Sequence, residues 1–347
     1  MPGCQQVQSG KRIRTSDGPP NQSPVKIAVV GCGAVGSYYG AKLSRAGHAV
    51  HFLLRSDYDV VHRQGLQIRS VDGDFRVQPQ CARAPEEIGA AELVLVGLKT
   101  TANHRFPALL PPLIGPRTAL ITLQNGLGNE AQLAALCGPE PVLGALCFVC
   151  LNRLKPGEIQ HLAYGQIVLG EYQRHPGPRT QRLAALFHQA GIGCEVTSDL
   201  ERARWEKLVW NVPFNGLGVA GTAGYEAVLS GELRADFRPG PCLTTDVLLG
   251  EPRWEALLRE LMSEVITTAQ ALGHDLAASL AGLNVARTRT MGAYKASTLL
   301  DYERHQPLEL QSMFLEPLRQ ARTAGVPTPR LEALCRVLRR LDPAQAA

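Results

Sequence analysis

The fold is decided by Val25-Lys26-Ile27-Ala28-Val29-Val30 and by the stretch that follows it directly, Gly31-Cys32-Gly33-Ala34-Val35-Gly36. The apolar run predicts a buried strand, and residues 37–46 predict a helix. Between them, Gly31 permits a tight turn, Gly33 lets backbone N–H groups approach a pyrophosphate, and Gly36 allows the helix to pack closely on the strand. We therefore expect residues 31–36 to bind the phosphates of a dinucleotide.

Similar units continue along the chain. Residues 49–54, 93–98 and 119–123 predict further buried strands, and helical stretches separate them. This alternation is typical of a doubly wound, mostly parallel α/β sheet. Beyond residue 198 the pattern becomes helical, with helices expected at 201–217, 252–272, 276–302, 308–324 and 330–341 and a loop at 228–243. We expect a disordered tail over residues 1–24, a nucleotide-binding domain over 25–198 and an all-α domain over 199–342.

Composition narrows the class of protein. The chain has 347 residues and a formal net charge of only +5, which does not favour a nucleic-acid partner. No apolar run approaches the roughly 20 residues of a membrane span. The start lacks the apolar segment of a secretory signal, and nine irregularly spaced cysteines suggest reduced thiols, so we expect a cytoplasmic protein. Cys147 and Cys150 have no partner pair at zinc-site spacing, so no metal is expected.

Two cations follow predicted strands. Arg55 comes 19 residues after Gly36, where an acidic residue would favour NAD and a cation favours the 2′-phosphate of NADP. Asp57 supports the competing interpretation, and an ordinary solvated arginine is a further alternative. Lys99 ends the strand at 93–98, and the carboxyl ends of such strands face the ligand cleft.

A polar row lies on an apolar helix. Lys207, Asn211 and Asn215 are spaced by four residues, which places them on one helix face. Such groups need partners or a ligand, and the alternative is a hydrogen-bonded seam between helices. Pro213 predicts a kink that frees the carbonyl of Val209.

A second polar group lies near the end of the chain. Ser297 and Asp301 are four residues apart, and Glu309 follows in the first turn of a helix expected to start at Pro307. The helix dipole would stabilise a carboxylate at that position. Taken alone, these three side chains would be ordinary surface residues.

Together, these motifs resemble the ketopantoate reductases (2-dehydropantoate 2-reductases). The resemblance rests on residues 31–36, Gln124-Asn125-Gly126, Trp205-x-Lys207-Leu208-x2-Asn211-x3-Asn215 and Ser297-x3-Asp301-x7-Glu309, and it extends from about residue 25 to 338. It implies a Rossmann domain followed by a helical domain, in a 6-phosphogluconate-dehydrogenase-like fold with the site in the cleft between them. It also implies NADPH-dependent reduction of 2-dehydropantoate to pantoate, a step of pantothenate and coenzyme A biosynthesis.

The resemblance also implies a role for each motif residue. Lys207 would be the catalytic acid, and Glu309 would lie beside it and the nicotinamide ribose as a second catalytic group. An ammonium can donate the proton that a ketone oxygen needs, and a neighbouring carboxylate would keep it charged. The substrate would contact Asn125, Asn211, Asn215 and Ser297. The cofactor NADP would contact Gly31, Cys32, Gly33, Ala34, Val35, Gly36, Arg55, Lys99, Asn125, Cys150 and Glu309.

The sequence departs from the family pattern in two places. The family usually has another polar substrate ligand, often Asn, after the lysine helix, and here Ser230, Thr244 and Thr245 compete for that role. Pro213 is not universal in the family. One alternative is a paralogous reductase of another 2-keto acid, and another is a non-catalytic NADP-binding regulatory protein. Assembly as a monomer or a homodimer stays open.

Overall fold

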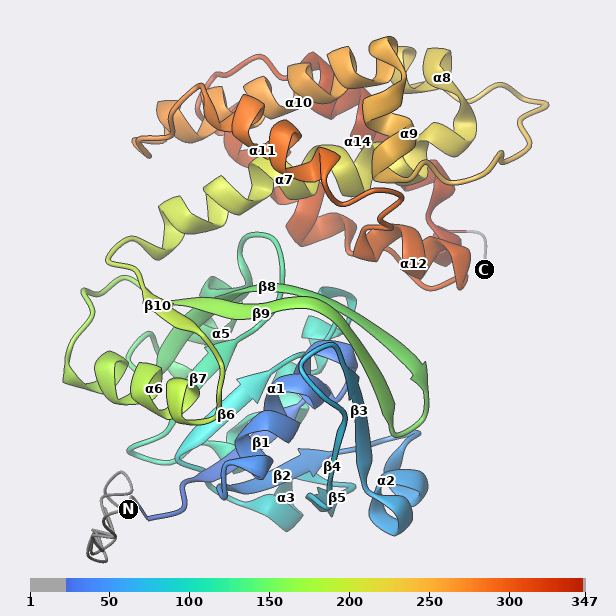
Figure 1. Ribbon diagram of the computed structural model, residues 1–347. Coiled ribbons are helices and arrows are strands. Elements are labelled where there is room, and N and C mark those ends of the chain that lie inside the picture. The colour runs from blue at the N-terminus through green and yellow to red at the C-terminus, as the bar shows by residue number, and fades with distance from the viewer. Residues whose placement is uncertain (1–22, 346–347) are drawn as a thin grey trace, which may run out of the picture.

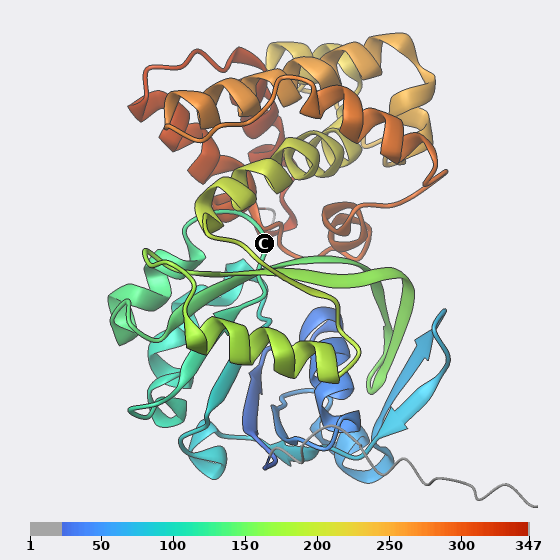
Figure 2. The ribbon, with the colours of Figure 1, turned by 60° about the vertical axis from the view of Figure 1, so that its left-hand side comes forward.

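The computed structural model describes residues 23–345, so nearly all of the tail expected at residues 1–24 lies outside the described part. A ten-stranded sheet with flanking helices forms the first half of the molecule, and a helical bundle forms the second (Figure 1). The two halves meet along the curled sheet, with the start of the bundle's first helix, α7, reaching down to it (Figure 2). The predicted fold class is confirmed.

The sheet is mostly parallel, as predicted. Its strand order is β4-β3-β9-β8-β7-β6-β1-β2-β5, with β10 beside β9, and seven of the nine strand pairs are parallel. The four predicted strands are β1 (Lys26–Val30), β2 (Ala49–Leu53), β6 (Leu93–Val96) and β7 (Ala119–Thr122). The remaining short strands are β3 (Leu66–Ser70), β4 (Phe75–Val77), β5 (Gln80–Ala82) and β10 (Cys194–Val196).

A long hairpin was not expected from the sequence. β8 (Val142–Lys155) and β9 (Glu158–Glu171) are antiparallel strands of 14 residues each, joined through Gly157, whose φ of 73° suits glycine. Register shifts interrupt the pairing at three points, as β-bulges do, and such bulges bend a strand. The hairpin curves between the other strands of the sheet and the helical half (Figure 1).

Helices cover both faces of the sheet, and each face has its own apolar core. Helix α1 begins at Ala34, three residues before the predicted start, with Gly33 as its N-cap. Its first turn therefore belongs to the glycine loop, and N–H groups there lack partners within the helix. The helices of the α/β half are α1 (Ala34–Arg45), α2 (Tyr58–Gln64), α3 (Pro85–Ile88), α4 (Phe106–Leu109), α5 (Asn129–Cys137) and α6 (Pro178–Gln189).

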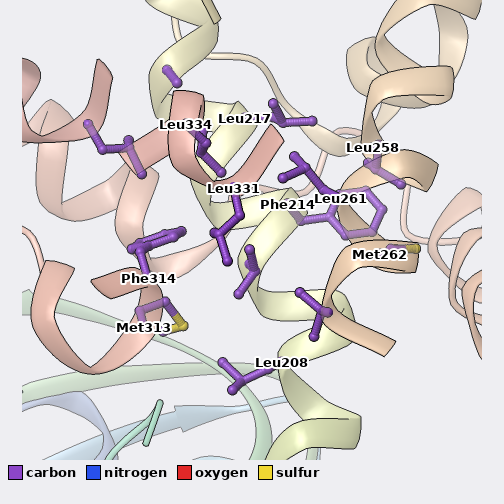
Figure 3. Packing of buried hydrophobic residues seen from close by; sticks show 14 of the residues in the cluster. Leu208, Phe214, Leu217, Leu258, Leu261, Met262, Met313, Phe314, Leu331 and Leu334 are labelled. Carbon is purple, nitrogen blue, oxygen red and sulfur yellow. The ribbon is translucent and has the colours of Figure 1, made fainter. Parts of the chain in front are cut away.

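The helical half is built around α7 (Leu200–Ala220). Phe214 and Leu217 of this helix face Leu258 and Leu261 on one side and Leu334 on the other (Figure 3). Gly216 and Gly218 let neighbouring side chains approach the α7 backbone. The surrounding helices are α8 (Tyr225–Ser230), α9 (Thr245–Gly250), α10 (Pro252–Ala271), α11 (Leu280–Arg289), α12 (Ser297–Glu303), α13 (Glu316–Thr323) and α14 (Pro329–Leu341).

Several predicted helix bounds are wrong. The helix expected at 276–302 is split into α11 and α12, with Gly292 at a φ of 62° between them. The loop expected from residue 228 starts only at Gly231, and α9 follows it unpredicted. A π-helical turn at Gln311–Leu315 precedes α13, so Glu309 lies before the helix and not in its first turn. Pro213 lies inside the 21-residue helix α7.

Candidate active site

A cavity of about 1740 Å³ lies between the two halves of the molecule. The carboxyl ends of β1, β2, β6 and β7 open onto it, and the hairpin β8–β9, α7, α11 and α12 complete its walls. All but one of the predicted site residues line this cavity. Those lining it are Gly31, Cys32, Gly33, Ala34, Val35, Arg55, Lys99, Asn125, Cys150, Lys207, Asn211, Asn215, Ser297 and Glu309.

The glycine loop has the geometry that a pyrophosphate needs. Gly31 has a φ of 97°, and a Cβ there would overlap the backbone nitrogen of Leu98. Gly36 lies beneath the loop, where a Cβ would overlap the carbonyl oxygen of Gly31. A Cβ on Gly33, in contrast, would have no described atom within 4 Å, so this face of the loop is open to the cavity. The residues therefore fit a dinucleotide at the N-terminus of α1.

The two charged residues after β2 are in different situations. Arg55 is exposed and lines the cavity. Asp57 is buried, and its Oδ2 accepts hydrogen bonds from Arg153 Nε at 3.2 Å and from Gly157 N at 3.4 Å. The Asp57 carboxylate is thus engaged by the hairpin, which favours Arg55 over Asp57 as the group that meets a ribose 2′-substituent.

Arg83 is a second arginine at this end of the cavity, and it was not predicted from the sequence. Arg83 follows β5, lines the cavity beside Arg55, and stacks its guanidinium on the ring of Tyr58 at 3.9 Å. It also pairs with Asp59 at 2.8 Å. No sequence signal marks it, because only the pairing of β5 with β2 brings it to this place.

Lys99 and Glu309 meet across the cleft. Lys99 Nζ lies 2.7 Å from Asp301 Oδ2 and 3.2 Å from Glu309 Oε2, and Thr100 N donates to Glu309 Oε1 at 2.7 Å. Desolvation by the cleft walls opposes the charge on Lys99, but Glu309 and Asp301 outweigh it and raise the pKa of Lys99. These bonds join the α/β half to the helical half.

The expected pairing of Glu309 with Lys207 is not observed. Lys207 Nζ donates instead to Asn125 Oδ1 at 2.8 Å and to the carbonyl of Cys147 at 2.6 Å. Its ammonium also lies 5.2 Å from the ring centre of Phe148. The reason is that Lys99 at the end of β6 reaches Glu309, whereas neutral oxygens from the loop after β7 and from β8 surround Lys207.

This environment changes the acidity of Lys207. Burial lowers the pKa of Lys207 to about 8; Cys147 opposes this shift and the nearby Arg204 cation adds to it. Such an ammonium gives up a proton far more readily than an ordinary lysine does. It therefore suits general acid chemistry near neutral pH.

Asn211 and Asn215, the other members of the polar row on α7, differ in their hydrogen bonds. Asn215 Oδ1 accepts from Thr298 N at 3.0 Å and from Ser297 Oγ at 3.4 Å, while Asn215 Nδ2 donates to the carbonyl of Asn211 at 3.0 Å. Asn215 thus ties α7 to α12, which is the interhelical seam considered above. Asn211 and Ser297 also line the cavity and remain candidates for substrate contact.

None of the three candidates for the further polar ligand lies at the cavity. Ser230 donates to the carbonyl of Glu226 at 2.9 Å, Thr245 donates to that of Gly292 at 2.6 Å, and Thr244 bonds Asp246. Asn284 of α11 lines the cavity instead. No sequence motif marks Asn284, because only the packing of α11 against α7 brings it to the cavity.

Neither a metal-binding cluster nor a membrane-spanning helix occurs in residues 23–345. No three or more His, Cys, Asp or Glu side chains there are grouped so that they could hold a metal ion. No helix of that region has an apolar run long enough to cross a bilayer.

Known proteins resemble this chain over most of its length. The family model described as "Ketopantoate reductase PanE/ApbA" matches residues 27–174, and the model for the C-terminal part of that family matches residues 242–342. A 2-dehydropantoate 2-reductase of Nostoc sp. is 38% identical over 91% of this chain and 95% of its own length. The crystal structure of a 2-dehydropantoate 2-reductase from Geobacter metallireducens superposes with a TM-score of 0.83 at 43% identity, covering 90% of this chain and 99% of that one.

The fold is also shared more widely. One example is D-mandelate dehydrogenase, solved as a ternary structure with NADH and anilino(oxo)acetate. It superposes with a TM-score of 0.79, covering 93% of this chain and 99% of that one. Because the identity is only 17%, this likeness shows the fold alone. The closer matches identify this protein as an oxidoreductase, so the alternative of a non-catalytic regulatory protein is set aside. By these matches the chain belongs to the ketopantoate reductase family.

Proposed function

We propose that this enzyme reduces 2-dehydropantoate to pantoate with NADPH. The observation that carries the proposal is the position of Lys207, whose ammonium lines the same cavity as the glycine loop and is held by two neutral oxygens. The names of the similar reductases from Nostoc and Geobacter support this substrate, and the geometry of the glycine loop supports a dinucleotide cofactor. In this proposal residues 25–198 bind the cofactor and residues 199–342 contribute most of the substrate contacts.

The chemistry assigned to Lys207 follows from its hydrogen bonds. A bound nicotinamide would supply the hydride for the ketone carbon. An ammonium has three N–H donors, and Asn125 Oδ1 and the Cys147 carbonyl accept two of them. Within residues 23–345 the third has no acceptor and can donate to the ketone oxygen, so the proton passes from Nζ to the oxygen as the alcohol forms. The neutral amine left behind then regains a proton from solvent.

Other residues would hold the substrate. Asn211 of α7 and Ser297 of α12 line the cavity. The Asn211 amide can bond a carboxylate or hydroxyl without competing for the transferred proton, and the Ser297 hydroxyl can do so by turning from its long 3.4 Å bond to Asn215. We assign Ser297 to the substrate carboxylate and Asn211 to its other oxygens. Asn284 is our candidate for the additional polar ligand.

The preference for NADPH rests on Arg55. Its guanidinium is exposed in the cavity and carries the charge that a 2′-phosphate requires, while the nearby Asp57 is engaged by Arg153. Lys99 and Glu309 would contact the cofactor, as would the backbone at Cys150. The eight described cysteines are all free thiols, which supports a reducing compartment such as the cytoplasm.

The test is the oxidation of NADPH and of NADH by the purified enzyme with several 2-keto acids. The panel contains 2-dehydropantoate, its analogue without the hydroxymethyl group (2-ketoisovalerate), pyruvate and phenylglyoxylate. We expect the highest kcat/KM with NADPH and 2-dehydropantoate. Comparable or higher values for another keto acid would contradict the proposed substrate but not the reaction type.

One observation favours a second candidate, the reduction of a 2-keto acid with a bulky apolar side chain. Phe148, Leu162 and Tyr164 line the cavity and remain 37%, 42% and 59% exposed. Apolar side chains left open in a cavity can accept an apolar substituent. A kcat/KM for phenylglyoxylate above that for 2-dehydropantoate would favour this candidate.

A further inference from the structure

A buried ion pair lies behind the proton donor proposed above. Arg204 of α7 binds Glu130 of α5, with its Nε 2.9 Å from Glu130 Oε1 and a second, close contact to the same oxygen. The side chains of Arg204 and Glu130 are only 4% and 7% exposed. The pair joins the helical half to the α/β half of the molecule at the base of the cleft.

The same arginine holds the loop that carries Asn125. A third guanidinium nitrogen of Arg204 donates to the carbonyl of Gln124 at 2.7 Å, one residue before Asn125. On the other side, Asn129 Nδ2 donates to the carbonyl of Asn125 at 2.9 Å. Backbone carbonyls on both sides of the Asn125 Cα are therefore held, which fixes the side chain that accepts from Lys207.

The space for the pair depends on a glycine. A Cβ on Gly144 of β8 would overlap Glu130 Oε1 and lie 2.9 Å from a terminal nitrogen of Arg204. Ordinary residues at position 144 would displace one partner or the other. The pair is thus built into the sheet and is not an incidental surface contact.

Arg204 and Lys207 are also electrostatically linked. They are three residues apart on α7, so their side chains lie on neighbouring positions of one helix face. The Arg204 cation favours loss of the proton from Lys207. Glu130 is paired with that cation, so its carboxylate should offset part of the effect. The other titratable group acting on Lys207 is Cys147 of β8, whose thiol is in contact with Tyr39 of α1. Across the cavity lie Lys99, Asp301 and Glu309.

We propose that Arg204 and Glu130 form a positioning pair, which holds Asn125 against Lys207 and places a paired charge one helical turn from this lysine. The inference rests on the proposed role of Lys207. It concerns residues that touch neither substrate nor cofactor, since neither Arg204 nor Glu130 lines the cavity.

The experiment measures the pKa of Lys207 directly, apart from catalysis. The chain has only seven lysines, so the rate at which acetic anhydride labels Lys207 can be followed by mass spectrometry at a series of pH values. The same variants are assayed for the pH dependence of kcat/KM. Glu130→Gln keeps the shape of the side chain but leaves the Arg204 cation without its counter-charge, whereas Arg204→Met removes the cation and leaves the carboxylate.

The two variants should act in opposite directions. Glu130→Gln should lower the pKa of Lys207 by about one pH unit, and Arg204→Met should raise it by a similar amount. Both should lower kcat by roughly 10- to 100-fold, because Asn125 is less firmly placed. Arg204→Lys keeps the charge but loses the forked bonding to Glu130 and Gln124, so it should lower kcat while leaving the pKa of Lys207 near that of the wild type.

A matched control comes from a second pair of the same construction. Arg179 binds Glu171 at 3.2 Å and the carbonyl of Glu140 at 2.8 Å, at the same open end of the hairpin, but among the described residues neither side chain bonds to Gln124, Asn125 or Lys207. Glu171→Gln should lower thermal stability without moving the pKa of Lys207.

The outcomes separate the two proposals. If labelling shows no shift for Glu130→Gln and Arg204→Met, or shifts of the same sign, the positioning pair is wrong. Opposite shifts in labelling without matching shifts in kcat/KM support the pair and count against Lys207 as the proton donor. Should Arg204→Met fail to fold, the nearly isosteric Glu130→Gln decides by itself, because an unchanged pKa overturns the proposal.

Discussion

At the scale of single residues, the protonation state of Lys207 should set the pH range of activity. A pKa of about 8 means that the ammonium is present below that pH and is lost above it. Because only the protonated form can donate, kcat/KM should fall as the pH rises through about 8. Lys207→Ala should lower kcat by roughly 10²–10⁴-fold, and Lys207→Arg should be nearly as inactive because a guanidinium does not release its proton.

Cofactor binding provides the control for this prediction. The fluorescence of bound NADPH should give nearly the same dissociation constant for wild type and both Lys207 variants. A Lys207→Ala enzyme that keeps most of its turnover would show that this lysine is a structural link between α7, Asn125 and Cys147.

We expect Arg55 to decide the choice between the two nicotinamide cofactors. Removing its charge in Arg55→Gln should raise the KM for NADPH about tenfold, since a charge-assisted hydrogen bond to a phosphate is lost. The KM for NADH, which lacks that phosphate, should stay the same and serves as the internal control. Equal use of both cofactors by the wild type would contradict this assignment.

Ser297 tests the substrate side of the cavity. Its contact with a carboxylate that does not react should be similar in the ground state and the transition state, so Ser297→Ala should mainly raise the KM for the keto acid. Steady-state kinetics with each substrate varied in turn will show this. The opposite pattern, weaker NADPH binding with an unchanged KM for the keto acid, would assign α12 to the cofactor.

At the scale of elements, the turn from β1 to α1 separates folding from ligand binding. Gly36→Ala should destabilise the protein, because the added Cβ overlaps the carbonyl of Gly31 within the turn. Gly33→Ala should leave the melting temperature nearly unchanged, since its Cβ would point into the open cavity, but should weaken NADPH binding by obstructing the pyrophosphate. Thermal melting and a fluorescence titration measure the two effects. A large loss of stability in Gly33→Ala would contradict this distinction.

At the scale of the whole molecule, the two halves should close on their ligands. The chain passes from β10 to α7 through the segment Thr197–Leu200, and we expect this segment to act as the hinge. Within it, Asp199 caps α7 by accepting a hydrogen bond from Arg202 N at 2.8 Å. Adding NADPH and the keto acid together should reduce the radius of gyration measured by X-ray scattering. Lys99→Met should increase it without ligands, because the bonds to Asp301 and Glu309 across the cleft are lost. An unchanged radius in both experiments would argue against closure.

The sequence predicted most of the structural features that depend on interactions between residues close together in the chain. The glycine loop, the four central strands and the polar face of α7 follow from short patterns, because glycine conformation, burial and helix periodicity act within a few residues. The antiparallel hairpin was missed, since a long bulged strand pair has no comparable local signal. The bounds of α11 and α13 were misplaced, and the short helices α8 and α9 were not predicted, because the turn at Gly292 and the packing of helices against one another outweighed helix propensity.

By itself the sequence determined the fold class and most of the residues that gather at the cleft, but not Arg83 or Asn284. Only the tertiary structure decided which charge meets which. Glu309 bonds Lys99, 210 residues away, and not Lys207, while Asp57 bonds Arg153, 96 residues away, and leaves Arg55 free to face the cavity. The physical reason is that electrostatic partners are chosen by distance in the packed molecule, which spacing along the chain does not encode.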